Sequence, residues 1–307
     1  MGRLFTFGCS FTNYIWPTWA DIISHDYDYY ENWGQRGAGN KYIYFSLIEC
    51  HQRNTITADD TVIIMWSSQA REDRFINGKW HTPGAVYKNS SYSEEFINEY
   101  TDTTGYLLDT VTYIQGSYHL LDFIGCKKHF FNMLPLDVST DSWLDLAPKL
   151  NLSISSKILK LYLPVLKHIK PSVYETVFNS DWHSRDDKII PAPASHWKNW
   201  TNTLYKNYTD NAGNNWPSFD DFFNNKLDNI ELHIIEEIDK QFGFIEIRDW
   251  VKLLKRADHH PTPIEHLEYL NCINFQVSKQ AQDFAEYWEE RVMSNTNNWQ
   301  NKKIKRF

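Results

Sequence analysis

Residues 61–66 (TVIIMW) form an unbroken apolar run that is rich in β-branched side chains and is bounded by polar residues. Such a run is typical of a strand buried on both faces, as in a parallel sheet covered by helices. Further strands are expected at 3–7, 27–32, 127–134 and 242–250, with helical segments between them. Alternating strands and helices predict an α/β fold with a central, mostly parallel sheet.

The expected helices lie between these strands and after the last one. Apolar periodicity and helix-start signals give the ranges 17–25, 41–52, 105–124, 151–169, 263–272 and 278–294. Residues 171–226 break the alternation, because they are rich in Asn, Asp, Trp, Pro and Ser and show weak periodicity. We interpret them as an insertion or cap within a single domain spanning 1–307, for which 42% hydrophobic residues provide an ample core.

The composition excludes several classes of protein. A net charge of −8 argues against a nucleic-acid partner, because phosphate binding needs a basic face. No apolar run approaches the roughly 18 residues of a membrane span, and the N-terminal MGRLFTFGCS lacks the apolar stretch of a secretory signal. The four cysteines are widely spaced and include no CxxC, so neither a disulfide framework nor a zinc site is expected. We therefore expect a protein that is cytoplasmic as synthesised, with no membrane partner.

Ser10 lies in FTFGCSFT, directly after the first predicted strand. A turn at the carboxyl end of a parallel strand presents its side chains where open α/β sheets bind ligands. Gly8 lets the chain turn sharply and approach a substrate closely. The segment is compatible with an ordinary turn serine or with a nucleophile, since a serine hydroxyl reacts only when a neighbouring base takes its proton.

A second polar segment, RADHHPTPIEH at 256–266, places Asp258, His259 and His260 just before a predicted helix start. Thr262 and Glu265 have the spacing of a capping box, which pins the loop against the helix. A loop held in this way can fix the direction of an imidazole, and a nearby carboxylate can fix its tautomer. The alternative interpretation is a polar loop that only leads into the helix.

Together the two segments resemble the SGNH (GDSL-like) hydrolases. GCSFT stands where that family has its Gly-Asp-Ser block, with Cys9 in place of the Asp, and NWGQRGAGN (32–40) resembles the second block, with Gly37 five residues after Asn32. The resemblance implies a three-layer α/β/α flavodoxin-like fold that needs no cofactor and no metal. It also implies that Ser10 is the nucleophile, and that Asp258 and His260 complete a catalytic triad.

The resemblance further implies an oxyanion hole formed by the backbone N–H groups of Ser10 and Gly37, which would stabilise a tetrahedral intermediate. The third block of the family offers an Asn side chain after the third strand, whereas VIIMWSSQAR offers Ser68 or Gln69, and the choice between these two stays open. The family spaces its Asp and His by two residues, and here Asp258 and His260 are separated by one. We favour His260 over His259 as the base because His260 precedes a proline.

Three functions remain open at this stage. The first is a serine esterase that removes an O-acyl (acetyl) group from a carbohydrate or another small ester through an acyl-enzyme. Its glycan substrate is suggested by aromatic residues of the insertion, which would otherwise serve only to pack the cap. These residues are Trp182, Trp197, Trp200, Tyr205, Tyr208 and Trp216.

The second function is a non-catalytic binding or structural module of the same fold, suggested by the missing Asn and the short Asp–His spacing. The third is a metal-dependent phosphoesterase that would use Asp258, His259, His260 and His266. It is the weakest of the three, because the first strand offers none of the acidic metal ligands that such an enzyme needs. The sequence gives no indication of the oligomeric state.

Overall fold

The computed structural model describes residues 2–14, 16–88, 92–136, 152–180 and 260–293. The chain divides into two compact units. The first comprises Met1–Ser184, His260–Arg291 and Lys302–Phe307, and it holds the described helices and strands apart from the end of the last helix. The second, Arg185–His259 with Val292–Asn301, lies almost wholly outside the described residues.

A five-stranded sheet forms the centre of the first unit. Its strands are β1 (Arg3–Phe7), β2 (Tyr29–Asn32), β3 (Thr61–Trp66), β6 (Lys127–Asn132) and β7 (Ile169–Ser172). They lie in the order β2-β1-β3-β6-β7, and every neighbouring pair is parallel. Counted along the chain this is the 2-1-3-4-5 order of flavodoxin-like folds. The predicted α/β class with a central parallel sheet is therefore confirmed.

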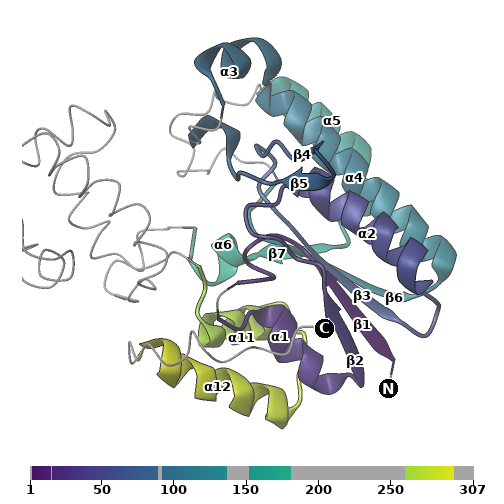
Figure 1. The fold of residues 1–307 in the computed structure, drawn as a ribbon, viewed down its shortest axis with the longest axis vertical. Coiled ribbons are helices and arrows are strands. Elements are labelled where there is room, and N and C mark those ends of the chain that lie inside the picture. The colour runs from purple at the N-terminus through teal and green to yellow at the C-terminus, as the bar shows by residue number, and fades with distance from the viewer. Residues whose placement is uncertain (1, 15, 89–91, 137–151, 181–259, 294–307) are drawn as a thin grey trace, which may run out of the picture. The chain divides into compact units, whose positions relative to one another are not determined.

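Helices cover both faces of the sheet, as Figure 1 shows. One layer contains α2 (Asn40–Asn54), α4 (Thr103–Ile124) and α5 (Leu152–Leu166). The other contains α1 (Trp19–Ile23), α11 (Pro263–Cys272) and α12 (Lys279–Met293). All six residues of β3 are buried between these layers, which explains its unbroken apolar run. The fold is thus a three-layer α/β/α sandwich.

Local sequence explains where several of these helices begin and end. α11 starts as predicted, because Thr262 and Glu265 form a capping box and Pro263 is the first helical residue. α1 starts at Trp19, two residues later than expected, because Thr18 caps it together with Asp21. α4 ends at Gly125, whose φ of 78° is a left-handed conformation that glycine adopts without strain.

Two parts of the chain differ from the expectation. The helix expected at 151–169 is confirmed as α5 over Leu152–Leu166, but it ends earlier than expected and β7 begins at Ile169. β7 and the short helix α6 (Val173–Thr176) also occupy the start of the expected insertion 171–226. The strand expected at 242–250 and residues 181–226 of the insertion lie outside the described residues.

The sequence analysis also missed a hairpin and a helix between β3 and α4. The hairpin pairs β4 (Arg74–Ile76) with β5 (Lys79–His81) in antiparallel fashion, and Asn77 and Gly78 form its turn with φ values of 52° and 77°. Asn-Gly is a strong hairpin signal, because both turn residues need positive φ. α3 (Glu94–Tyr100) follows, with Ser93 capping it.

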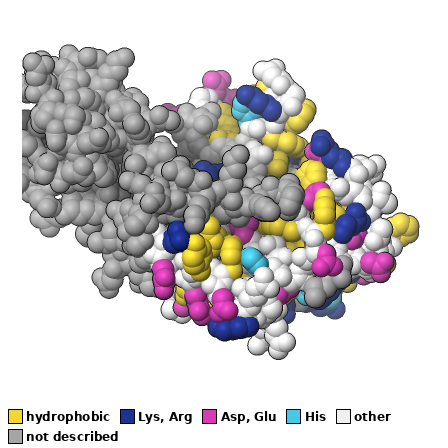
Figure 2. Space-filling view, turned by 60° about the horizontal axis from the view of Figure 1, so that its bottom comes forward, with side chains coloured by type: hydrophobic (Ala, Val, Ile, Leu, Met, Phe, Trp, Pro, Cys, Tyr) yellow, Lys and Arg dark blue, Asp and Glu magenta, His cyan; other side chains and the backbone are white. Residues whose placement is uncertain are grey.

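The surface of the α1, α11 and α12 layer comes forward in Figure 2. Acidic side chains gather along the lower edge of this face, among scattered basic and hydrophobic ones. This distribution fits the net charge of −8. In the part of the chain that the structure describes, no helix combines the length and the apolar character that crossing a membrane requires.

Candidate active site

Ser10 lies at the carboxyl end of β1, between the ends of β2 and β3. The direction of chain progression reverses at this point of the sheet, and open α/β sheets bind their ligands outside such reversal points. The backbone N–H groups of Thr12 and Asn13 donate to the carbonyl of Cys9 at 3.0 and 3.1 Å, which closes a tight turn around Ser10. The Ser10 side chain is 8% exposed. The position agrees with the one expected from the sequence.

Gly8 sets how closely this turn folds against the strand. A Cβ atom at Gly8 would lie 2.0 Å from Thr12 Oγ1 and 3.0 Å from the carbonyl oxygen of Met65. Any side chain at this position would therefore push the Ser10 turn away from the end of β3. Glycine therefore allows the sharp turn here, while the predicted close approach to a substrate stays a prediction.

Two asparagines join the Ser10 turn to the Gly-rich loop that follows β2. Asn32 Nδ2 donates to the carbonyl of Thr12 at 2.8 Å, and Asn32 Oδ1 accepts from the N–H of Gly34 at 2.9 Å. Asn13 Nδ2 donates to the carbonyl of Gly34 at 2.7 Å. These three hydrogen bonds hold the Ser10 turn and the Gly-rich loop in one fixed arrangement. They are the two segments that resemble the first and second SGNH blocks.

Gly37 is the residue of the Gly-rich loop that was predicted to donate to an oxyanion. Its φ is 73°, and a Cβ atom there would lie 2.1 Å from the carbonyl oxygen of Thr82. Thr82 also fastens the loop through its hydroxyl, which donates to the carbonyl of Arg36 at 2.9 Å and accepts from Gln35 Nε2 at 2.9 Å. Only glycine fits this position, while the oxyanion role of Gly37 stays a prediction.

The segment after β3 is held by Asn40, the first residue of α2. Asn40 Oδ1 accepts from the N–H of Ser67 at 2.8 Å, and Asn40 Nδ2 donates to the carbonyl of Ser67 and to Thr110 Oγ1, both at 3.1 Å. Ser68 and Gln69 follow and are buried. Gln69 lines a cavity of about 70 Å³ with Asn40 and residues of α4, so its side chain lies beside the α2–α4 layer. Ser68 as the third oxyanion donor stays a prediction.

Several buried polar atoms at the carboxyl edge of the sheet have no hydrogen-bond partner among the residues that the structure describes. They are Thr12 Oγ1 after β1, Ser67 Oγ and Gln69 Oε1 after β3, and Asn132 Oδ1 at the end of β6. Buried polar atoms without partners are uncommon, and each calls for an explanation such as a ligand or water site. Unpartnered buried atoms also occur elsewhere in the described residues, so these four agree with a ligand site at this edge without singling it out.

His260 comes to the same edge from the far end of the sequence. Its ring stacks on Tyr14 with 3.8 Å between ring centroids and an interplanar angle of 14°, and it lies edge-on to Phe11 at 5.3 Å. The next residue is anchored as well, since Trp16 Nε1 donates to the carbonyl of Pro261 at 2.8 Å across 245 residues. The structure therefore brings His260 against the turn that carries Ser10, while its predicted role as base stays a prediction.

No hydrogen bond joins the Ser10 hydroxyl to His260 among the described residues. Within the described ranges the Ser10 hydroxyl makes no hydrogen bond, so the expected bond from Ser10 to His260 stays a prediction. Catalytic hydrogen bonds are often long or poorly aligned until a substrate binds. Asp258 and His259 lie outside the described residues, so the orienting role of Asp258 also stays a prediction.

The residues that position His260 were missed by the sequence analysis. Phe11 and Tyr14 hold the ring, and the guanidinium of Arg36 lies 5.2 Å from the Tyr14 ring centroid, which joins this cluster to the Gly-rich loop. Asn40 was also missed, because it is the last residue of the NWGQRGAGN segment and was given no role there. The only available signal was its place at the start of a helix directly after the Gly-rich loop.

The metal-dependent alternative needs His266 close to Asp258, His259 and His260. His266 is buried and lies edge-on to Phe11 with 6.4 Å between ring centroids. The described part of the chain contains no group of three His, Cys, Asp or Glu side chains able to hold a metal ion. Since Asp258 and His259 lie outside that part, the alternative stays a prediction.

No protein-family model and no curated protein matches this sequence. Among solved structures, the chain is similar to a member of the lipolytic protein G-D-S-L family from Veillonella parvula DSM 2008. The two share 16% identity over 59% of this chain and 82% of that chain, with a TM-score of 0.33. A likeness at this level carries no argument about activity. The strand order and the site define the chain as a flavodoxin-like α/β protein with a polar site at the ends of β1 and β3.

Proposed function

We propose that this protein is an ester hydrolase of the SGNH (GDSL-like) type, with Ser10 as nucleophile and His260 as base. The observation that carries the proposal is the packing of the His260 ring on Phe11 and Tyr14, within the turn that carries Ser10. An imidazole beside a serine at the carboxyl edge of a parallel sheet is the arrangement that nucleophilic acyl transfer needs.

The proposed reaction begins when His260 accepts the proton of the Ser10 hydroxyl as Ser10 Oγ attacks the ester carbonyl. The backbone N–H groups of Ser10 and Gly37, with the Ser68 side chain as third donor, stabilise the negative oxygen of the tetrahedral intermediate. His260 then protonates the leaving alcohol, and a water molecule activated by the same imidazole releases the acid from the acyl-enzyme. Asp258 orients the imidazole and stabilises its charged form.

The proposed substrate is an O-acyl (acetyl) ester on a carbohydrate or another small molecule. This finer assignment is supported by the resemblance of the Ser10 and Gly37 segments to a family that includes esterases and carbohydrate O-deacetylases. The aromatic side chains in the expected insertion 171–226 add the kind of surface on which sugar rings stack.

Turnover of p-nitrophenyl acetate by the full chain tests the proposal. We expect Ser10→Ala to lower kcat by about 10³-fold or more, because no other group can form the acyl-enzyme. Ser153→Ala, an exposed position on α5, is the matched control and should leave the rate unchanged. Hydrolysis that survives in Ser10→Ala at the wild-type rate would overturn the assignment.

A second candidate is a non-catalytic binding module with the same fold. It is favoured by the absence of a hydrogen bond from the Ser10 hydroxyl within the described residues, and by the lack of an Asn after β3. A wild-type protein that hydrolyses neither aryl acetates nor acetylated sugars, yet binds a glycan, would support this candidate.

A further inference from the structure

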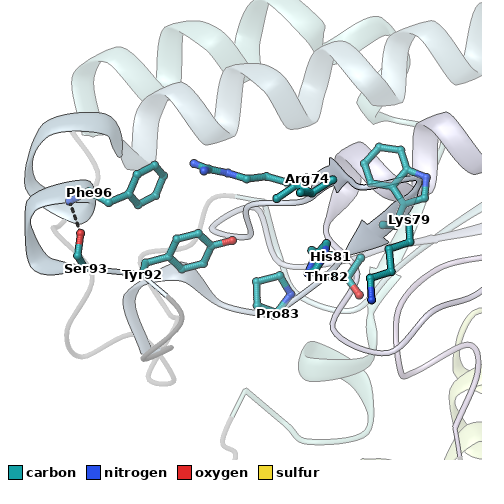
Figure 3. A pocket seen from close by; sticks show the side chains of 10 residues that line it. Arg74, Lys79, His81, Thr82, Pro83, Tyr92, Ser93 and Phe96 are labelled. Atoms are coloured by element: carbon teal, nitrogen blue, oxygen red, sulfur yellow. Dashed lines mark hydrogen bonds between the residues drawn. The ribbon is translucent and has the colours of Figure 1, made fainter.

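A cavity of about 590 Å³ lies between the β4–β5 hairpin and the start of α3, and of its lining residues only Thr82 also belongs to the site described above. Its volume is within the range of small-molecule binding sites, which is about 300–1,000 Å³. Figure 3 shows its two walls, with basic side chains from the hairpin on one side and Tyr92 and Phe96 on the other.

The register of the hairpin explains why its basic residues face the cavity. Arg74 pairs with His81 across the two strands, and Lys79 lies two residues before His81, so all three side chains are on one face. Ile76 pairs with Lys79 and shares this face. Trp80 packs against Phe75 and aromatic side chains of α2, and it also lines the cavity. The hairpin thus presents its basic side chains to the cavity together with apolar surface from Ile76 and Trp80.

Arg74 is held in place with most of its donors unused. Its Cζ lies 4.5 Å from the ring centroid of Phe96 and 5.8 Å from that of Tyr92, so the two rings fix the guanidinium. Its Nε reaches Glu72 Oε1 at 3.4 Å, and the Tyr92 hydroxyl donates to the Glu72 carbonyl at 2.7 Å. Within the described residues the terminal guanidinium nitrogens have no acceptor. A fixed guanidinium with a free edge is suited to a carboxylate, which it binds with two parallel hydrogen bonds.

Among the described residues, no acidic side chain pairs with the other basic side chains of the cavity. Neither Lys79 nor His81 has an ion pair or hydrogen bond there, and Glu72 is the acidic partner of Arg74 alone. Glu72 is also engaged by Tyr106, whose hydroxyl donates to Glu72 Oε2 at 2.9 Å. An unneutralised basic cluster in a chain with a net charge of −8 favours an anionic ligand at this position.

The cavity adjoins the loop of the candidate active site through one residue. Thr82 lines the cavity, and its carbonyl occupies the space where Gly37 has no side chain. Its hydroxyl is fastened to Gln35 and Arg36 of the same loop. A ligand in the cavity therefore lies next to the loop that carries the predicted oxyanion donor.

We propose that this cavity binds the carboxylate of an acidic sugar and thereby directs the hydrolase to esters of acidic glycans, the second part resting on the function proposed above. Arg74 binds the carboxylate in bidentate fashion, Lys79 adds charge, and the hydroxyls of Thr82 and Ser93 face the ring hydroxyls of the sugar. The volume accommodates a sugar unit rather than a lone small anion.

Calorimetric titration of the full chain with digalacturonate tests the binding, with the neutral disaccharide of galactose as the ligand control. We expect the acidic disaccharide to bind at least about 10-fold more tightly, and Arg74→Gln and Lys79→Gln each to weaken it about 10-fold or more. Arg74→Lys keeps the charge but loses the bidentate geometry, so it should also weaken binding. Lys127→Gln changes the net charge equally at an exposed position on β6 and should have no effect.

Equal affinity for the two disaccharides, or an equal loss in Lys127→Gln, would overturn the proposal. Competition by inorganic phosphate at the same concentration as digalacturonate would show a general anion site and overturn the sugar assignment. Thermal unfolding of each variant shows whether a loss of affinity reflects misfolding. Lys79 lies at the exposed end of the hairpin, so Lys79→Gln tests the binding site independently of Arg74. If binding follows the prediction while Ser10→Ala hydrolyses aryl acetate normally, the cavity assignment stands and the proposed catalytic function fails.

Discussion

Individual residues fix the candidate site through close contacts that leave little freedom. Gly8 and Gly37 each lie where a Cβ atom would collide with a neighbouring residue, at 2.0 and 2.1 Å. The imidazole of His260 is held between Phe11 and Tyr14, and such stacking restricts its direction without using its nitrogens. The site is therefore defined as much by apolar and steric contacts as by its polar groups.

A different histidine makes stability depend on pH. His129 on β6 has its pKa lowered to about 4, mainly by burial and further by the charges of Lys127 and Lys170. The unfolded chain, with an ordinary histidine pKa of about 6.5, binds more protons between pH 6.5 and pH 4 than the folded chain does. The contribution of neutral His129 is therefore complete above pH 6.5 and is lost as the pH falls toward 4.

Urea unfolding at pH 7 and pH 5 measures this contribution. Wild type should lose about 1 kcal/mol of unfolding free energy through His129 between these pH values, after allowance for partial solvent exposure. His129→Gln cannot take up a proton at this position. Its unfolding free energy should therefore fall less than that of wild type between the two pH values, and the difference should equal the His129 contribution. An identical pH dependence in both proteins would show that His129 is not responsible.

At the level of elements, one side chain ties β3 to two helices. Asn40 begins α2, binds both backbone groups of Ser67 just after β3, and reaches Thr110 on α4. The segment that follows β3 is the one from which the third oxyanion donor is expected. Its position therefore depends on a helix that contributes no predicted catalytic group.

Removal of this link has a predictable cost. Asn40→Ala should lower the unfolding free energy by about 3 kcal/mol, because it leaves the buried N–H and carbonyl of Ser67 without partners. Chemical denaturation measures the change, and Asn98→Ala on the exposed face of α3 should change it by less than about 0.5 kcal/mol. Equal, small effects of the two substitutions would contradict the structural role of Asn40.

Some helices and strands could be predicted from local sequence patterns, and others could not. The apolar run of β3 and the capping box of α11 are local patterns, and both predictions are confirmed. β7 was missed because Pro171 lies inside it, and proline is tolerated only in an edge strand, a position that local sequence does not reveal. The β4–β5 hairpin carried a readable Asn77–Gly78 signal that was overlooked.

For the whole molecule, the alternation of strands and helices was sufficient to predict a parallel sheet between two helical layers. Periodicity could not predict that His260 packs on Phe11 and Tyr14, because no local pattern encodes a contact between opposite ends of the chain. The expectation that His260 lies near Ser10 came instead from the resemblance of two separate segments to one family. The triad acid Asp258 lies outside the described residues, so its role still rests on the resemblance alone.

The central claim is that His260 activates Ser10, and covalent labelling tests it most directly. A fluorophosphonate reacts with a serine hydroxyl only when a base has activated it. We predict one adduct per chain, mapped by peptide mass spectrometry to Ser10, with labelling slowed about 10³-fold in His260→Ala and largely retained in His259→Ala. Labelling at another residue, or equal rates for wild type and His260→Ala, would contradict the account.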